Sequence, residues 1–248
     1  MATEFVSSAP TSNGENCPIY FAEMHDVSSR LYEPSSESNS IVEFWHQVCQ
    51  PLIDNPTKYG FDEHDKPRAD AGWNWKSYLQ TYVWLGAQLG QEPRAYAVVY
   101  ETGEGYFPAA MLLLARNYRD LNTPKQKASF GWFMSVAPNC VYEYHENHGN
   151  YGITTKNAPK NLGKILVDSL MVASNIRGHK GRIGLHADPA GKEELTSFYE
   201  GIPLQRLDSE IKISLARGND GNYFFSDEKN SLALTTQFDH FRPKVPKA

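Results

Sequence analysis

The sequence is poor in the features that define several large classes of protein. It has only three cysteines, Cys17, Cys49 and Cys140, and their odd number and wide spacing indicate reduced thiols rather than a disulfide framework. No apolar run approaches the roughly 20 residues that a membrane helix needs. The N-terminus lacks both the basic and the apolar region of a secretion signal. We therefore expect a cytoplasmic protein without a membrane partner.

The short motifs of the common hydrolases, ATPases and zinc enzymes are also missing. The sequence contains no Gly-x-Ser-x-Gly, Walker A, His-Glu-x-x-His or paired Cys-x-x-Cys pattern. His145 and His148 lie downstream of Cys140, but the spacing is loose and no fourth ligand is evident, so we expect no metal. A net charge of −5 and a pI near 5.9 do not fit the broad basic surface of a nucleic-acid-binding protein.

Hydrophobic periodicity and turn residues predict a mixed α/β fold. With 248 residues, of which 40% are hydrophobic, the chain can bury a substantial core, which we place in one domain at 17–240 after a flexible tail at 1–16. Helices are expected at 41–53, where Ser40 and Glu43 form a capping box, at 73–89, and from about residue 161. Strands are expected at 18–22, 95–100, 108–115, 129–136, 183–187, about 203–217 and about 222–238.

Charge is distributed unevenly along the chain. Residues 1–126 carry 16 acidic and 9 basic side chains, whereas residues 156–182 carry a net charge of +5. A local basic cluster in an acidic protein suggests a bound anion. Here the basic residues bracket the start of a helix, which is a common phosphate site. The alternative is an ordinary solvated helix face.

The segment 130–207 carries the most specific signal. An apolar strand ends at Pro138, an Asn-Leu-Gly163 turn opens a helix, a second strand covers 181–187, and Phe198-Tyr199 precede Gly201. This order resembles the acyl-CoA-binding half of the GNAT acetyltransferase superfamily. The resemblance implies a strongly twisted mixed sheet with helices on both faces and a V-shaped splay between the two central parallel strands. It also divides the domain into an acceptor-side half at about 17–126 and an acyl-CoA-binding half at about 127–210.

The resemblance assigns candidate residues for binding acetyl-CoA. The backbone of the central strand would pair with the pantetheine amides, and the helix N-terminus would hold the pyrophosphate on its unpaired N–H groups. Gly163 would let the backbone approach the phosphates closely. The candidate cofactor-binding residues are Met134, Ser135, Val136, Lys160, Asn161, Leu162, Gly163, Lys164, Ile165 and Lys192.

The resemblance also names a proton donor. Tyr199 corresponds to the family tyrosine that protonates the departing CoA thiolate, and the pKa values of phenols and thiols are close enough for this transfer. The general base stays open. The segment between Pro138 and Pro159 is dense in groups that accept protons, and we take Glu143 and His145 from it as candidates.

The expected function is therefore an N-acetyltransferase that moves an acetyl or other acyl group from acetyl-CoA to a primary amine by direct attack. The amine belongs to a small molecule or to a protein. The acidic first half and its aromatic residues, Trp73, Trp75, Tyr78 and Tyr82, suit a cationic acceptor. One alternative is a non-catalytic binding protein of the same fold with a degenerate CoA site, and a more distant one is a nucleotide-binding α/β protein. The assembly state is open, with a homodimer among the options.

Overall fold

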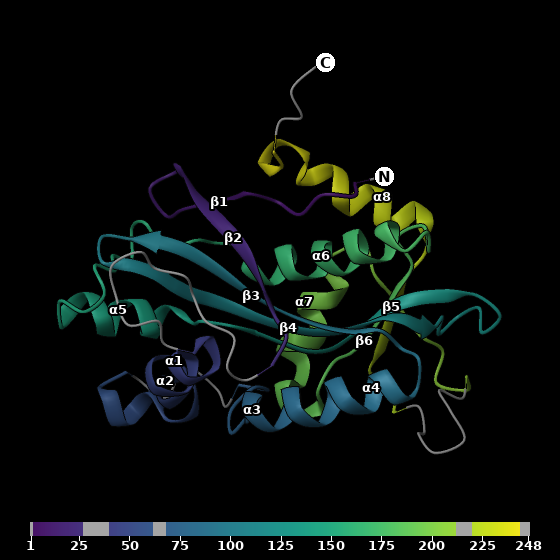
Figure 1. Cartoon of the computed structure of the whole chain (residues 1–248), viewed down its shortest axis with the longest axis horizontal. Coiled ribbons are helices and arrows are strands. Elements are labelled where there is room, and N and C mark those ends of the chain that lie inside the picture. The colour runs from purple at the N-terminus through teal and green to yellow at the C-terminus, as the bar shows by residue number, and fades with distance from the viewer. Residues whose placement is uncertain (1, 27–39, 62–67, 212–219, 244–248) are drawn as a thin grey trace.

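A mixed β-sheet is the frame on which the rest of the molecule is built. The computed structural model describes residues 2–26, 40–61, 68–211 and 220–243. Eight strands form the order β1-β2-β3-β4-β5-β6-β8-β7, and Figure 1 shows this twisted layer between two groups of helices. The strands are β1 (Ser8–Pro10), β2 (Asn16–Met24), β3 (Pro93–Thr102), β4 (Gly105–Arg119), β5 (Lys127–Val136), β6 (Ile183–His186), β7 (Gln205–Arg206) and β8 (Tyr223–Ser226).

One pair of strands, β5 and β6, runs parallel, whereas the other neighbouring strands pair antiparallel. A parallel pair needs a crossover connection, which the helix α6 (Leu162–Ile176) supplies. This helix packs closely on β5, since a Cβ added to Gly131 would lie 2.9 Å from Leu170 Cδ1. The mixed α/β fold and the crossover predicted from the sequence are confirmed.

A β-bulge opens the sheet between its two parallel strands. The register between β4 and β5 shifts between Leu113 and Leu114, and Trp132 is the extra residue on β5. The pairing of β5 with β6 ends at the same place, where Gly131 lies opposite Leu185. Because a bulge bends its strand and increases the local twist, β5 turns away from β6 beyond this point. This is the splay that the sequence led us to expect.

Helices cover both faces of the sheet. In Figure 1, α1 to α4 lie below the sheet, and α6 and α8 lie above it. The helix predicted at 41–53 is present as α1 and α2, and Ser40 Oγ accepts a hydrogen bond from Glu43 N–H at 3.4 Å. The helix predicted at 73–89 is present as α3, η2 and α4, and its middle part, η2, is π-helical.

The helices other than α6 have the following bounds: α1 (Ile41–Val48), α2 (Gln50–Asp54), η1 (Pro56–Tyr59), α3 (Trp75–Tyr78), η2 (Leu79–Val83), α4 (Trp84–Gln88), α5 (Asn139–Asn147), η3 (Pro189–Gly191), α7 (Lys192–Glu200), α8 (Glu228–Gln237) and η4 (Asp239–Phe241).

The first residues of the chain belong to the fold, so the predicted flexible tail at 1–16 was wrong. β1 pairs with β2, and the side chains of Val6 and Ala9 are buried. Phe5 stacks on Phe21 of β2 with ring centroids 4.6 Å apart. The polar composition of this segment concealed three apolar side chains, whose burial adds to the backbone hydrogen bonds that hold it against the sheet.

Two of the predicted strands differ from the structure. The expected strand at 222–238 is the short strand β8 followed by α8, whose N-cap Asp227 accepts a hydrogen bond from Asn230 N–H at 2.8 Å. In the expected strand at 203–217 only β7 forms within the described residues, and 212–219 lie outside them. The segment that follows Pro138 begins with the helix α5.

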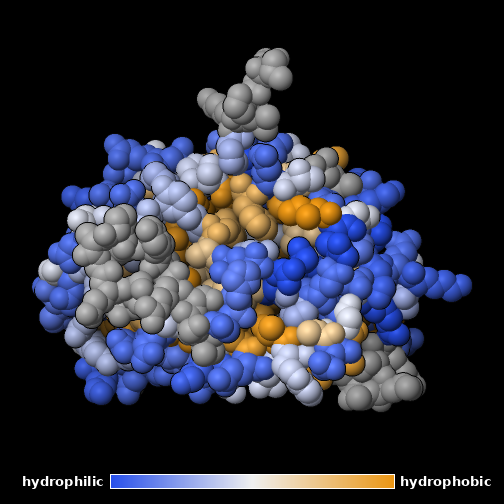
Figure 2. All heavy atoms as spheres, viewed as in Figure 1, coloured by the Kyte–Doolittle hydropathy of each residue, from blue (hydrophilic) through white to orange (hydrophobic). Residues whose placement is uncertain are grey.

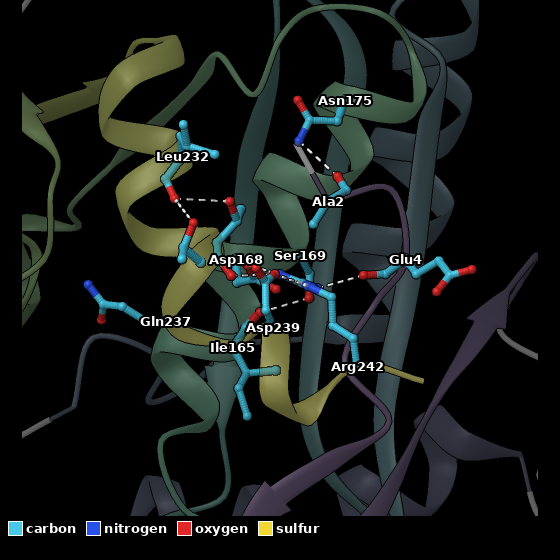
Figure 3. A network of polar contacts seen from close by, with 12 residues as sticks. Ala2, Glu4, Ile165, Asp168, Ser169, Asn175, Leu232, Gln237, Asp239 and Arg242 are labelled. Carbon is cyan, nitrogen blue, oxygen red and sulfur yellow. Dashed lines mark hydrogen bonds and ion pairs between the residues drawn. The ribbon is translucent and has the colours of Figure 1, made fainter. Parts of the chain in front are cut away.

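A buried ion pair fastens the C-terminal end of the chain to α6, as Figure 3 shows. Arg242 Nη2 lies 2.7 Å from Oδ1 of Asp168, whose side chain is fully buried. Arg242 also donates to the carbonyl oxygens of Glu4 (2.5 Å) and Thr235 (3.3 Å), so it joins the N-terminal segment, α6 and α8. Burial raises the pKa of Asp168 to about 6, although Arg242 acts in the opposite direction.

Hydrophilic residues cover most of the rim of the molecule, and hydrophobic ones are visible in the middle of the face in Figure 2. Three large exposed hydrophobic residues, Trp84, Leu85 and Leu89, lie on or just after α4. Among the described residues, no helix combines the length and the apolar character needed to cross a membrane.

Candidate functional site

A cavity of about 530 Å³ lies where β5 separates from β6. Its walls come from the central part of β5, the segment after β6, α7, and the connector between α2 and α3. This volume falls in the range of small-molecule sites, which are of the order of 300–1,000 Å³. The lining residues are Arg68, Ala69, Asp70, Trp73, Tyr82, Phe130, Gly131, Trp132, Phe133, Met134, His186, Asp188, Pro189, Gly191, Glu194, Leu195, Phe198 and Tyr199.

The bulge leaves part of the β5 backbone without a strand partner on the splay side. Within the described residues, β6 pairs only with 129–131 of β5, although β5 continues to Val136. An extended ligand that carries amide groups can add to such a free edge as a further strand. Met134, one of the three predicted pantetheine-pairing residues, lines the cavity, and Ser135 and Val136 follow it on the same strand.

Arg68 and Asp70 tie the α2–α3 connector to this free edge. The Arg68 guanidinium donates to both carboxylate oxygens of Asp70 and to the carbonyl oxygen of Val136, with all three distances 2.8 Å. Ser135 Oγ donates to the buried Asp70 carboxylate. The Val136 carbonyl, which we predicted to bind pantetheine, therefore already accepts a hydrogen bond. Sequence reasoning missed this pair.

Tyr199 lies deep in the wall of the cavity. Its side chain is 5% exposed, and its ring packs on Phe224 of β8 with centroids 5.4 Å apart. Burial raises the pKa of the phenol well above its ordinary value. No hydrogen bond joins its hydroxyl to another group within the part of the chain that the structure describes. The tyrosine therefore stays protonated at neutral pH, and its raised pKa makes it a weaker acid toward a thiolate than an exposed phenol.

The N-terminus of α6 has the backbone geometry of an anion site. Asn161 adopts the left-handed conformation, with φ 59°, and the first helical hydrogen bond runs from Ile165 N–H to Asn161 C=O at 3.0 Å. The N–H groups of Leu162, Gly163 and Lys164 therefore have no acceptor within the helix. Asparagine is one of the few residues other than glycine that readily adopt this conformation.

Gly163 has a packing role that the sequence did not reveal. A Cβ added to it would lie 3.0 Å from the ring of Phe198 in α7, and Phe198 also lines the cavity. This ring therefore stands between the N-terminus of α6 and the cavity. Close approach of the two helices is sufficient reason for a glycine at this position.

The basic residues of 156–182 do not form one cluster, so the predicted single anion site must be corrected. They stand at opposite ends of α6, whose 15 residues span about 22 Å. At the C-terminal end Arg177 pairs with Glu92, and Arg182 Nε lies 3.8 Å from Asp120 Oδ2. Only the lysines at the N-terminal end, Lys156, Lys160 and Lys164, lie where they would meet an anion bound at the helix start.

The candidate bases Glu143 and His145 lie on α5 and do not line the cavity. Glu143 borders a separate polar pocket together with Lys156 and Lys160. His145 is buried, its Nε2 lies 3.2 Å from the carbonyl oxygen of Val48, and burial lowers its pKa. The structure therefore does not bring these two side chains together with Tyr199. Lys192 begins α7, and its side chain lies outside the described part of the structure.

Among the described residues, His186 is the histidine that lines the cavity. It is the last residue of β6, its Nε2 lies 2.8 Å from Asp220 Oδ2, and its ring packs on Tyr223 with centroids 4.4 Å apart. Sequence reasoning treated it only as part of a strand. No group of three or more His, Cys, Asp or Glu side chains in the described ranges could hold a metal ion.

The architecture is similar to that of solved GNAT acetyltransferases. A GNAT-family acetyltransferase from Staphylococcus aureus Mu50 shares 13% identity over 85% of this chain and 99% of its own, with a TM-score of 0.44. Spermidine N-acetyltransferase from Vibrio cholerae, solved with CoA and spermine, shares 11% identity over 86% of this chain and 98% of its own, with a TM-score of 0.41. Neither protein-family models nor curated protein sequences match this chain. At these identities the likeness concerns the arrangement of elements.

Proposed function

We propose that the chain is an N-acyltransferase that moves an acetyl or related acyl group from acetyl-CoA to a primary amine. The observation that carries this proposal is the free edge of β5, which begins at the Trp132 bulge and opens directly into a cavity containing Tyr199. Backbone N–H and C=O groups there can pair with the amides of a pantetheine arm. They would bring its thioester into the splay.

The residues at the start of α6 fit the phosphate part of acetyl-CoA. Three helix N–H groups without helical acceptors follow the left-handed Asn161, and Lys160 and Lys164 flank them. This combination of backbone donors and positive charge suits a pyrophosphate. When bound, acetyl-CoA supplies the activated thioester, and the amine supplies the nucleophile.

Two residues that line the cavity, His186 and Tyr199, carry out the proton transfers of the proposed reaction. The amine nitrogen attacks the thioester carbon, and N–H groups near the bulge stabilise the negative charge that develops on the carbonyl oxygen. His186, oriented by Asp220, accepts the amine proton. The C–S bond then breaks, and Tyr199 gives its hydroxyl proton to the thiolate. His186 replaces Glu143 and His145 in this scheme because it alone of the three lines the cavity.

The proposal is tested by equilibrium binding and by turnover. We expect acetyl-CoA to raise the melting temperature, and a ligand at about 100 times its Kd adds about 2.7 kcal/mol to the stability. Incubation of acetyl-CoA with a set of primary amines should then release free CoA thiol. Mass spectrometry should find acetylated products that are about 42 Da heavier than the starting amines. Neither binding nor thiol release at millimolar acetyl-CoA would contradict the proposal.

The second candidate is a binding protein of the same fold without catalysis. Two contacts favour it: Arg68 occupies the Val136 carbonyl, and Phe198 packs against Gly163. Both contacts narrow the route that an acyl-CoA would follow. Acetyl-CoA binding without thiol release for any amine in the set would support this candidate over the enzyme.

A further inference from the structure

We propose that the acceptor part of the cavity selects a primary amine carried on a flat, apolar body of one or two rings. This inference rests on the proposed function and specifies its substrate class. The competing classes are linear polyamines and protein amines. Three features of the cavity bear on this choice: its aromatic walls, its acidic side chains and the Tyr199 hydroxyl.

The wall on the side of α3 and η2 is aromatic and partly open. Phe133 contacts Trp73 at a centroid distance of 5.1 Å and Tyr82 at 4.8 Å, and Tyr82 contacts Trp132 at 5.5 Å. All four side chains line the cavity, and none is fully buried. The mutual edge contacts fix the rings in place and leave aromatic surface toward the cavity. Such a surface binds a flat apolar group and, at its faces, a cation.

Asp188 provides negative charge beside this wall. It lines the same cavity as the four aromatic residues. Asp188 Oδ1 accepts a hydrogen bond from Ala190 N–H at 2.9 Å, and the other oxygen remains available to a ligand. Of the other two carboxylates that line the cavity in the described residues, Asp70 is buried and paired with Arg68, and Glu194 is exposed on α7.

Tyr199 is the second, independent indication of a ligand. It is 95% buried, it lines the cavity, and within the described residues its hydroxyl has no hydrogen-bond partner. A hydroxyl that borders a cavity without a protein partner is free to bond to a ligand or to water there. The described part of the cavity thus offers the carboxylates of Asp188 and Glu194, the Tyr199 hydroxyl and an aromatic wall. The acidic side chains suit an ammonium group, and the aromatic wall favours an ammonium on a flat apolar body over a linear polyamine.

The inference is tested by binding of amines in the absence of acetyl-CoA, which separates it from the proposed function. Calorimetric titrations would compare tryptamine and 2-phenylethylamine with spermidine and with indole-3-ethanol, which has the same ring but no charge. We expect each aromatic amine to bind at least about tenfold more tightly than spermidine and the neutral alcohol, a difference of about 1.4 kcal/mol. Tighter binding of spermidine, or equal binding of tryptamine and its alcohol, would overturn the inference even if acetyl-CoA binds normally.

Two pairs of variants locate the effect. Asp188→Asn keeps an oxygen that can accept from Ala190 N–H but removes the charge, so tryptamine affinity should fall about tenfold while the alcohol is unaffected. Its control is Glu193→Gln, an exposed residue of α7 that does not line this cavity. Tyr82→Leu should weaken both ligands, whereas the matched control Trp84→Leu, on the exposed face of α4, should weaken neither. Equal effects within either pair would overturn the assignment.

Discussion

Replacing Arg242 by Met should destabilise the protein strongly at neutral pH. The methionine keeps the apolar stem of the side chain but leaves the Asp168 carboxylate, which is 0% exposed, without an opposite charge. Oδ2 of this carboxylate already lacks a hydrogen-bond partner. Breaking a buried pair from one side costs about 3–5 kcal/mol. We expect the free energy of unfolding at pH 7 to fall by this amount, with the loss of the bonds to Glu4 and Thr235 included.

The pH dependence of this effect follows from the pKa of Asp168. The folded-state pKa is about 6, against an ordinary value of 3.8, so the folded protein holds this proton more tightly than the unfolded chain does. The stabilisation that Asp168 gives by binding its proton more tightly in the folded state is therefore fully present below about pH 4. It is lost as the pH rises toward 6. Without Arg242 the folded-state pKa rises further, and the loss continues to higher pH. The deficit of the variant should be large at pH 7 and small at pH 4.5.

Urea denaturation of both proteins at the two pH values measures this deficit. The control is Lys180→Met, which removes an exposed ion pair in which Nζ lies 3.5 Å from Glu228 Oε2. Exposed pairs contribute little, so the control should stay within about 0.5 kcal/mol of the wild type at both pH values. A deficit for Arg242→Met below about 1 kcal/mol at pH 7, or an equal deficit at pH 4.5, would refute the reasoning.

Three further predictions concern the site. Tyr199→Phe should lower kcat by a factor on the order of 10² with little change in the KM for acetyl-CoA, and steady-state kinetics with unchanged kcat would remove the tyrosine from the mechanism. His186→Gln should lower kcat in steady-state kinetics, whereas His145→Gln, which does not reach the cavity, should leave kcat unchanged. Gly163→Ala should cost about 1–3 kcal/mol in thermal unfolding because the new methyl group meets the Phe198 ring, and Phe198→Leu in the same chain should recover part of this loss.

The sequence predicted those elements whose pattern is set by local periodicity. The helix α6 repeats its apolar residues at helical spacing, and the strands β3, β4 and β5 are long apolar runs, so each was found within a few residues of its bounds. The N-terminal segment and α8 were missed for a common reason. Each is polar in composition and is held in place by contacts with distant residues. Phe5 of the N-terminal segment stacks on Phe21, and Ser231 of α8 donates a hydrogen bond to the Gly181 carbonyl oxygen.

The site was predicted less completely than the fold. The resemblance placed Met134 and Tyr199, and both line the cavity. The Trp132 bulge depends on the register between two strands, which no local pattern determines. Arg68 and Asp70 reach the β5 edge only because the connector folds back over 65 residues of chain. His145 looked reactive from its sequence neighbours, but burial against Val48 makes it part of the core.

The most direct test of the proposed acyl-CoA site is hydrogen–deuterium exchange of the whole chain with and without acetyl-CoA. The account predicts slower exchange of the amides in 132–136 and 162–165, because pantetheine would pair with the free edge of β5 and the pyrophosphate would bind the N–H groups at the start of α6. Amides of β2, at the far side of the sheet, should exchange at the same rate in both samples. Protection confined to other segments, or none at saturating acetyl-CoA, would contradict the account.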